Sequence, residues 1–536
     1  MYRCLFASIL LVVSADVARA ADPTFWQDVF PVFRRHCTVC HKEKYLKELD
    51  VSGGLALDSY AATLKGAKQA VLQAGKSADS PLYQLLVIQD EKKRMPQGDK
   101  PLHEESITLI RRWIDTGAKE GVKPETVTSE VAGPQAVVRK LDVLLPTAAV
   151  PPKDLLGPGN PQKLELALKV GPLSPVTALA FSPDGKLLAT GSYGLVTVWD
   201  LEKAEPLKTL TNVLGAVNCL RFSPDGALLA VAGGQPSARG EVRLYAVADW
   251  KLLTTLGGHT DVVSSVAFRP DGKVLATGSF DKNVRTWDLA TYKPLQTHGG
   301  HSDFVYAVAF SPDGANLASA SKDRTVKLVD AVSGKSLLTF SGMDQDVLTV
   351  AFSPDGKQVV SSGLESQLFW WNPKTGERVR RQGGHGIAVH EVIFSKDGKQ
   401  AASAGADRTV KLWNADTGTV AQNIQVGSIV YAVALSPDGK RVAAGSFDGL
   451  VRLYDAASMR HLVTLLSLPP DGDKPHWLAQ TPEGYSTISE PLAGQAQWRM
   501  AGKPVTPDAV WGALRQSESV AKAARGEALS PVNFGK

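Results

Sequence analysis

Cysteine is scarce in this chain of 536 residues, which contains four. Four cysteines, one of them at position 4, are too few for the disulfide framework of a cysteine-rich secreted domain. After the first 20 residues no apolar run reaches the roughly 18 residues that a membrane-spanning helix needs. The formal net charge of +5 is small for this length, so it indicates neither a nucleic-acid partner nor an anionic membrane surface.

The first 20 residues have the pattern of a secretory signal peptide. Arg3 supplies a positive charge, residues 5–13 form a short apolar core, and Ala18-Arg19-Ala20 fits a small-residue cleavage site. We therefore predict that residues 1–20 are removed, and Cys4 with them. The mature protein is expected to be exported, to the periplasm or an equivalent compartment, without a membrane span.

Two of the remaining cysteines lie in the run Cys37-Thr38-Val39-Cys40-His41. This spacing is the attachment signature of c-type haem, in which two thiols form thioethers with the haem and the histidine binds its iron. A structural zinc site needs four ligands, and no second cysteine pair follows. A thioredoxin-like redox pair follows a strand, whereas the apolar spacing before Cys37 is helical. The motif predicts one covalent haem c, with His41 as an axial ligand.

A second axial ligand is expected from the segment that follows the motif. Met95 is the only methionine between residues 21 and 121, and it lies in a polar Met-Pro-Gln-Gly loop that does not suit a core residue. A thioether opposite His41 gives the His/Met pair that raises the reduction potential. His103 competes for this role, but it stands at the start of a predicted helix, so we interpret it as a surface residue.

The same region ends in a helical apolar stripe, followed by Gly117 as the expected end of the helix. The stripe consists of Ile107, Ile110, Trp113 and Ile114. About 100 residues with few long apolar runs make a thin core, and a covalent haem would add apolar surface to it.

Several motifs, in order over residues 25–118, resemble the planctomycete-type cytochrome c domain. They are the Cys-x-x-Cys-His run, Gly-Leu-Ala-Leu-Asp-Ser-Tyr at 54–60, Ser-Pro-Leu-Tyr at 80–83, Arg-Met-Pro at 94–96 and Arg-Arg-Trp-Ile-Asp-Thr-Gly at 111–117. The resemblance implies haem c bound covalently by Cys37 and Cys40, with His41 and Met95 as axial ligands. Gln97 stands where this family usually has a second proline.

A turn with the sequence Pro-Asp-Gly, or once Lys-Asp-Gly, recurs through the second half of the chain. Its aspartates are at positions 184, 225, 271, 313, 355, 397 and 438. Seven copies about 42 residues apart predict a β-propeller, because a single four-stranded sheet cannot bury both of its faces. The longest spacing contains a glycine-rich insertion at 233–240, which we expect to be a loop used for binding or a tolerated surface insertion. Either residues 164–170 or residues 461–466 are expected to form the fourth strand of the blade that closes the ring.

Gly258, His259, Ser279, Asp281 and Trp287 resemble the WD40 repeat and its buried His–Ser–Asp–Trp network. The copies with His301 and His385 match it in part, and Val329 replaces one tryptophan. The resemblance implies that these histidines are structural and are not metal ligands. Cys219 lies in an apolar strand pattern and is interpreted as a small buried hydrophobic residue.

We therefore predict a multidomain chain: a small all-α c-type cytochrome domain followed by an all-β, seven-bladed WD40-type propeller. The expected divisions are a signal peptide (1–20), the haem domain (22–121), a proline-rich linker (122–162), the propeller (163–466) and a C-terminal capping tail (467–536) with a helix from 507 to about 525.

The function predicted from these features is electron transfer by an exported cytochrome whose propeller docks redox partner proteins. With both axial positions of the iron filled, no site is open for substrate, so we expect no enzyme. Two alternatives stay open. One is an oxidoreductase with a second cofactor or a substrate site on the propeller, and the other is a haem-based sensor in which loss of Met95 opens the iron.

Overall fold

The computed structural model describes parts of residues 22–120, the strand at 137–144 and most of residues 163–529. The chain divides into two compact units, Met1–Ala132 and Gly133–Lys536. The predicted signal peptide, the haem-binding residues Cys37, Cys40 and His41, and His103 lie outside the described residues, as does most of the predicted linker. No helix of the described residues is long and apolar enough to cross a membrane.

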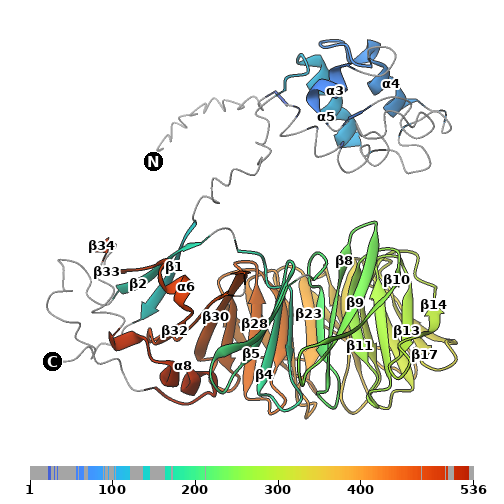
Figure 1. Cartoon of the computed structure of the whole chain (residues 1–536). Helices are drawn as coiled ribbons and strands as arrows, with labels where there is room; N and C mark the ends of the chain where they lie inside the picture. Colours follow the sequence, from blue (N-terminus) through green and yellow to red (C-terminus); the bar gives the residue numbers. More distant parts are fainter. Residues whose placement is uncertain are drawn as a thin grey trace, which may run out of the picture. The chain divides into compact units, whose positions relative to one another are not determined.

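The described part of the first unit consists of short helices (Figure 1). They are α3 (Tyr60–Lys65), the 3-10 helix η3 (Ser77–Asp79), α4 (Pro81–Val87) and α5 (Glu104–Asp115). Pro81 occupies the first position of α4, where its missing N–H costs no hydrogen bond. The described residues of this unit include no strand, and the all-α character of the whole predicted haem domain stays a prediction.

Helix α5 ends as the sequence predicts. Gly117 has a φ of +97°, and its N–H donates to the Ile114 carbonyl at 3.0 Å. The N–H of Ala118 donates to the Trp113 carbonyl at 2.8 Å, so two carbonyls of the last turn have partners. Ile110, Trp113 and Ile114 are fully buried, which confirms that the stripe faces the core.

Residues 178–471 form the seven sheets of a β-propeller (Figure 1). The first four blades are β3–β6 (Ala178–Phe181, Leu187–Ser192, Leu195–Asp200, Glu205–Leu210), β7–β10 (Cys219–Phe222, Leu228–Gln235, Arg239–Ala246, Leu252–His259), β11–β14 (Val263–Phe268, Val274–Ser279, Val284–Asp288, Pro294–His298) and β15–β18 (Val305–Phe310, Asn316–Ser321, Val326–Asp330, Ser336–Phe340).

The remaining three blades complete the ring. They are β19–β22 (Val347–Phe352, Val359–Gly363, Gln367–Trp371, Arg378–Gly383), β23–β26 (Val389–Phe394, Gln400–Gly405, Thr409–Asn414, Val420–Gln425) and β27–β30 (Val430–Leu435, Arg441–Ser446, Val451–Asp455, His461–Asp471). All neighbouring strands within a blade are antiparallel, and the first strand of each blade lines the centre. The seven-bladed propeller predicted from the repeat is confirmed.

The recurring turn joins the first two strands of each blade. In the first blade the Ser182 hydroxyl donates to Asp184 and accepts the N–H of Leu187 at 2.9 Å, and Gly185 has a φ of +73°. A residue with a β-carbon is strained at that φ, which accounts for the glycine. The same serine–aspartate pair occurs in five more blades, and Arg269 replaces the serine in the third.

The last blade is completed by β30, and residues 164–170 belong to a different sheet. Strand β2 (Lys163–Val170) pairs with β1 (Val137–Leu144) on one side and with β33 (Ala496–Met500) on the other, and β34 (Lys503–Pro504) follows. The blades therefore close as a ring without a strand from the beginning of the propeller segment.

The insertion at 233–240 extends a hairpin instead of forming the expected loop. Strands β8 and β9 continue through it, with Gly234 opposite Gly240 and Gln235 opposite Arg239. Glycine is required at position 234, because a β-carbon there would lie 2.5 Å from the Arg239 carbonyl oxygen. The insertion is thus a projecting two-stranded ribbon.

The C-terminal segment packs on the seventh blade. Strands β31 (Lys474–Gln480) and β32 (Ser486–Ile488) extend that blade to six strands, and α6 (Glu490–Ala493) and α8 (Ser517–Ala524) follow. Of the helix expected from 507 to about 525, residues 507–511 lie outside the described residues, residues 512–514 are helical, and α8 covers Ser517–Ala524. Arg441 joins this segment to the first blade, since it donates to the Ala524 carbonyl and to the Gly185 carbonyl.

Candidate functional site

Met95 is the one predicted haem ligand that the structure describes. Its side chain is partly buried and packs against the apolar cluster of the first unit. Its N–H donates to the Leu85 carbonyl at 2.9 Å, in the last turn of α4. The last carbonyls of a helix have no partner within the helix, so this hydrogen bond both satisfies α4 and fixes the loop that carries the thioether.

The cluster beside Met95 is rich in aromatic rings. The centroid of Trp113 lies 5.7 Å from that of Phe25 and 6.4 Å from that of Phe33, and all three side chains are fully buried. Aliphatic residues of α4 and α5 complete the cluster. A thioether next to such an apolar surface fits a haem, which needs an apolar wall and a soft axial donor. Ligation by Met95 stays a prediction.

The predicted network of the WD40 repeat is present in the third blade, with one difference. His259 Nδ1 lies 2.8 Å from Asp281, and Nε2 lies 2.7 Å from the Thr277 hydroxyl, which also accepts the Trp287 indole N–H at 3.0 Å. The hydroxyl in the network is therefore that of Thr277. Ser279, the serine expected from the sequence, donates to the Asp261 carbonyl instead.

The equivalent histidines elsewhere have both ring nitrogens engaged as well. His301 contacts Asp323 and Ser319, and His385 contacts Asp407 and Ser403. In the fifth blade Met343 takes the place of the histidine, and its sulfur accepts the Ser361 hydroxyl at 3.4 Å. The described residues contain no group of three or more His, Cys, Asp or Glu placed to hold a metal ion.

The stability of the third blade is expected to depend on acidity through Asp281. Burial alone would raise the pKa of this carboxyl, but hydrogen bonds from His259 and from two backbone N–H groups outweigh burial and hold the pKa at about 2, below the ordinary 3.8. The carboxylate thus contributes about 2 kcal/mol of stability above pH 4, which is lost as the pH falls towards 2.

Urea unfolding of the wild type and of Asp281→Asn, measured from pH 6 down to pH 2.5, tests this expectation. The difference in unfolding free energy is expected to be largest above pH 4 and to shrink on acidification. A difference that stays constant over this range would show that the network does not favour the ionised carboxylate.

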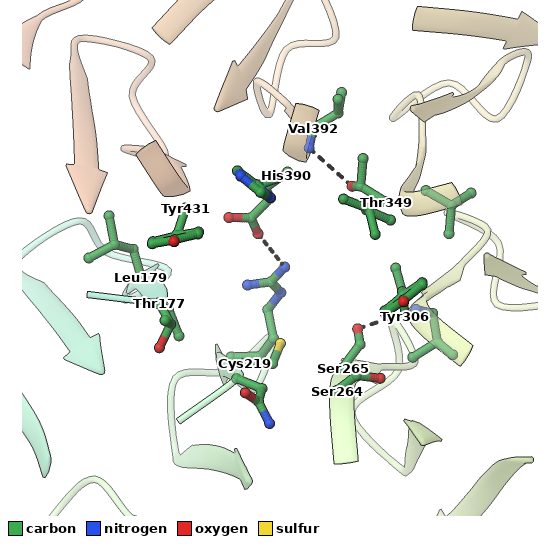
Figure 2. Close-up of a pocket in the computed structure, with 18 residues that line it drawn as sticks. Thr177, Leu179, Cys219, Ser264, Ser265, Tyr306, Thr349, His390, Val392 and Tyr431 are labelled. Atoms are coloured by element: carbon green, nitrogen blue, oxygen red, sulfur yellow. Dashed lines mark hydrogen bonds and ion pairs between the residues drawn. The ribbon is translucent and has the colours of Figure 1, made fainter. Parts of the chain in front are cut away.

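The centre of the propeller holds a charged pair that the sequence analysis missed. Arg221 of the second blade donates to Glu391 of the sixth at 3.0 Å, and Glu391 also accepts the Val433 N–H at 3.0 Å. Around this pair, Tyr306, His390 and Tyr431 point into the same channel from three different blades (Figure 2).

A signal for Arg221 was nevertheless present in the repeat. The equivalent position holds alanine in five other blades and isoleucine in the remaining one. A single arginine at a repeat position that is otherwise apolar indicates that this residue has a role of its own. Nearby Cys219 is buried in the channel wall, as predicted, with its sulfur 3.8 Å from the Val266 carbonyl oxygen.

The seven-bladed ring with its histidine–aspartate networks places the chain in the class of WD40-type propellers. The family model for the WD domain, G-beta repeat, matches seven segments that run from residue 166 to residue 455, and the chain belongs to this family. A second family model, Planctomycete cytochrome C, matches residues 37–99. Together the two matches indicate a haem-binding protein with a propeller scaffold.

The curated relatives match about a fifth of the chain. The chain is 32% identical to Pre-mRNA-processing factor 19 of Oryza sativa over 22% of each chain. It is 31% identical to an uncharacterized WD repeat-containing protein of Synechocystis over 20% of this chain and 31% of that protein. It is 36% identical to the WD repeat-containing protein SL1-17 of Schistosoma mansoni over 20% and 34%. The chain thus covers about a third or less of each of these relatives.

Proposed function

We propose that this protein is an exported electron-transfer cytochrome that carries one covalent haem c and docks redox partner proteins on its propeller. The observation that carries the proposal is the cytochrome C match over residues 37–99, which includes Cys37, Cys40, His41 and Met95. A bound haem would supply reversible one-electron oxidation and reduction of its iron.

The predicted haem-binding residues have different roles. Cys37 and Cys40 would hold the haem through thioethers, and His41 and Met95 would supply the two ligands of its iron. The backbone contact of Met95 with Leu85 keeps the thioether beside the apolar cluster, which excludes water from that side. Because the chain itself would supply both ligands, no position on the iron would be left for a substrate or a gas, and this favours electron transfer over catalysis or sensing.

Exposed apolar side chains on the propeller support a docking role. Tyr193, Ile387 and Phe447 are 68%, 58% and 55% exposed, and they lie on loops at the same end of the first, sixth and seventh blades, which are neighbours in the ring. Large exposed apolar groups that gather at one place mark surfaces for protein partners.

The first experiment is the optical spectrum of the purified protein, produced in a host that matures c-type cytochromes. We expect a pyridine haemochrome with the thioether-type α-band, and in the oxidised form the weak near-infrared band of a sulfur–iron bond. The mass of the protein is expected to lack residues 1–20. Met95→Ala should keep the α-band and lose the near-infrared band.

Three results would argue for other functions. Absence of haem would contradict the central proposal. A covalent haem without the near-infrared band in the wild type would exclude Met95 as a ligand and favour the sensor or the oxidoreductase. Ready binding of carbon monoxide to the reduced wild type would show an open position on the iron.

A further inference from the structure

The Pro-Asp-Gly face of the propeller carries an apolar funnel at the end of the central channel. The last residue of the innermost strand of every blade lines it, and these residues are Phe181, Phe222, Phe268, Phe310, Phe352, Phe394 and Leu435. Prolines of the recurring turns, among them Pro183 and Pro437, form its rim. The space, including its open mouth, amounts to about 1500 Å³.

Arg221 stands at the inner end of this funnel. It directly precedes Phe222. It lines both the funnel and the adjoining part of the channel shown in Figure 2, which contains Tyr306 and Tyr431 and is called the upper part below. Of its five N–H donors, one is used by the Leu220 carbonyl and one by Glu391. The other three have no partner among the described residues, and the side chain is 37% exposed.

The charged side chains that line the funnel are positive, and the aspartates of the recurring turns directly follow the prolines of its rim. Arg221 and Lys396 are the charged residues that line it, and none of the described lining residues carries a carboxylate. Glu391, the partner of Arg221, lines the upper part of the channel and not the funnel. An apolar wall with a few well-placed polar donors is the usual composition of a small-molecule site.

We infer that the funnel binds a small apolar carboxylate. The apolar part of the ligand packs against the phenylalanine side chains that line the funnel. Its carboxylate accepts hydrogen bonds from the remaining N–H donors of Arg221, whose planar guanidinium suits a carboxylate. A neutral molecule of the same shape would leave these donors without a partner, and a short carboxylate would lack the apolar contact. The inference concerns the propeller alone and does not depend on the proposed haem chemistry.

Calorimetric titration of the full-length protein with three probes tests the inference. The probes are octanoate below its micelle concentration, the neutral octanamide and the short acetate. We expect octanoate to bind about tenfold more tightly than octanamide, because hydrogen bonds to charged groups are stronger than those to neutral ones. Acetate should show no measurable binding.

The double variant Arg221→Met/Glu391→Gln removes both charges and leaves no lone carboxylate in the channel. It should lower octanoate affinity about tenfold and leave octanamide affinity unchanged. Tyr431→Phe, in the upper part of the channel, is the matched control and should bind octanoate like the wild type. Near-ultraviolet circular dichroism checks that each variant is folded.

Several outcomes overturn the inference. Equal affinity for octanoate and octanamide would show that the charge is not recognised. If none of the three probes binds, the proposed site does not exist. Loss of octanoate binding in Lys396→Gln, with normal binding in the double variant, would place the anion at the rim and not on Arg221. Loss in Tyr431→Phe would place the ligand in the upper channel.

Discussion

A variant with serine in place of both Cys37 and Cys40 is expected to carry no covalent haem. A serine hydroxyl does not add to the haem in the way that a thiol does, so neither thioether would form, and only the proposed ligands His41 and Met95 would hold the haem. Haem staining of the denatured protein after gel electrophoresis measures the result directly. We expect the staining to fall from one haem per chain to none.

Cys219→Ala is the matched control, because Cys219 is the other cysteine of the predicted mature chain and lies in the propeller wall. It should keep its full haem content and lose some stability through the small cavity that it leaves. Covalent haem in the double serine variant, or its loss in Cys219→Ala, would refute the assignment of the motif.

The variant with serine at both Cys37 and Cys40 should also have a less stable first unit. Its apolar cluster is small, and the haem is expected to add apolar surface to it. Near-ultraviolet circular dichroism should therefore show a looser aromatic environment, while the propeller signal stays unchanged. An unaltered first unit without haem would show that this cluster is sufficient by itself.

The second large effect is expected for Asp407→Ala in the sixth blade. Asp407 accepts hydrogen bonds from the ring of His385, the Thr409 hydroxyl and the Gly386 N–H. His385 is buried, so removing the carboxylate leaves donors without partners in the interior. We expect a loss of about 3–4 kcal/mol, measured by urea unfolding with tryptophan fluorescence, since Trp413 reports on this blade.

Asp397→Ala provides a control in the same blade. Asp397 accepts the Ser395 hydroxyl and the Lys399 N–H in the exposed recurring turn. Its removal should cost about 1 kcal/mol, because water can replace the lost partners there. Equal losses of stability in Asp407→Ala and Asp397→Ala would show that the buried network contributes no more than the exposed turn.

Local sequence was sufficient for the parts of the structure that repeat or that depend on a short spacing. The recurring turn needs an aspartate and a glycine at adjacent positions, preceded by proline in six copies and by lysine in one, and its seven copies predicted the seven blades. The helix end at Gly117 follows from a positive φ that glycine adopts easily. The cysteine–histidine spacing likewise predicts a haem attachment site without reference to the fold, and this site stays a prediction.

Other predictions failed or stayed open because they depend on contacts between distant segments. Strand β2 has the alternation of a blade strand, yet it pairs with β33, more than 300 residues away. The insertion at 233–240 is rich in glycine, but the ladder between β8 and β9 holds it as a hairpin. Both Thr277 and Ser279 carry a hydroxyl, and the position of the His259 ring decides which of them joins the network.

The identity of the residues therefore determined the kind of blade, the number of blades and the chemistry expected at Cys37, Cys40 and His41. Ring closure decided what residues from different blades do together. In the sequence Arg221 and Glu391 are two unrelated charges 170 positions apart, and closure brings them to 3.0 Å in the channel. It also gathers one apolar residue from each blade into the funnel, a surface that no single blade contains.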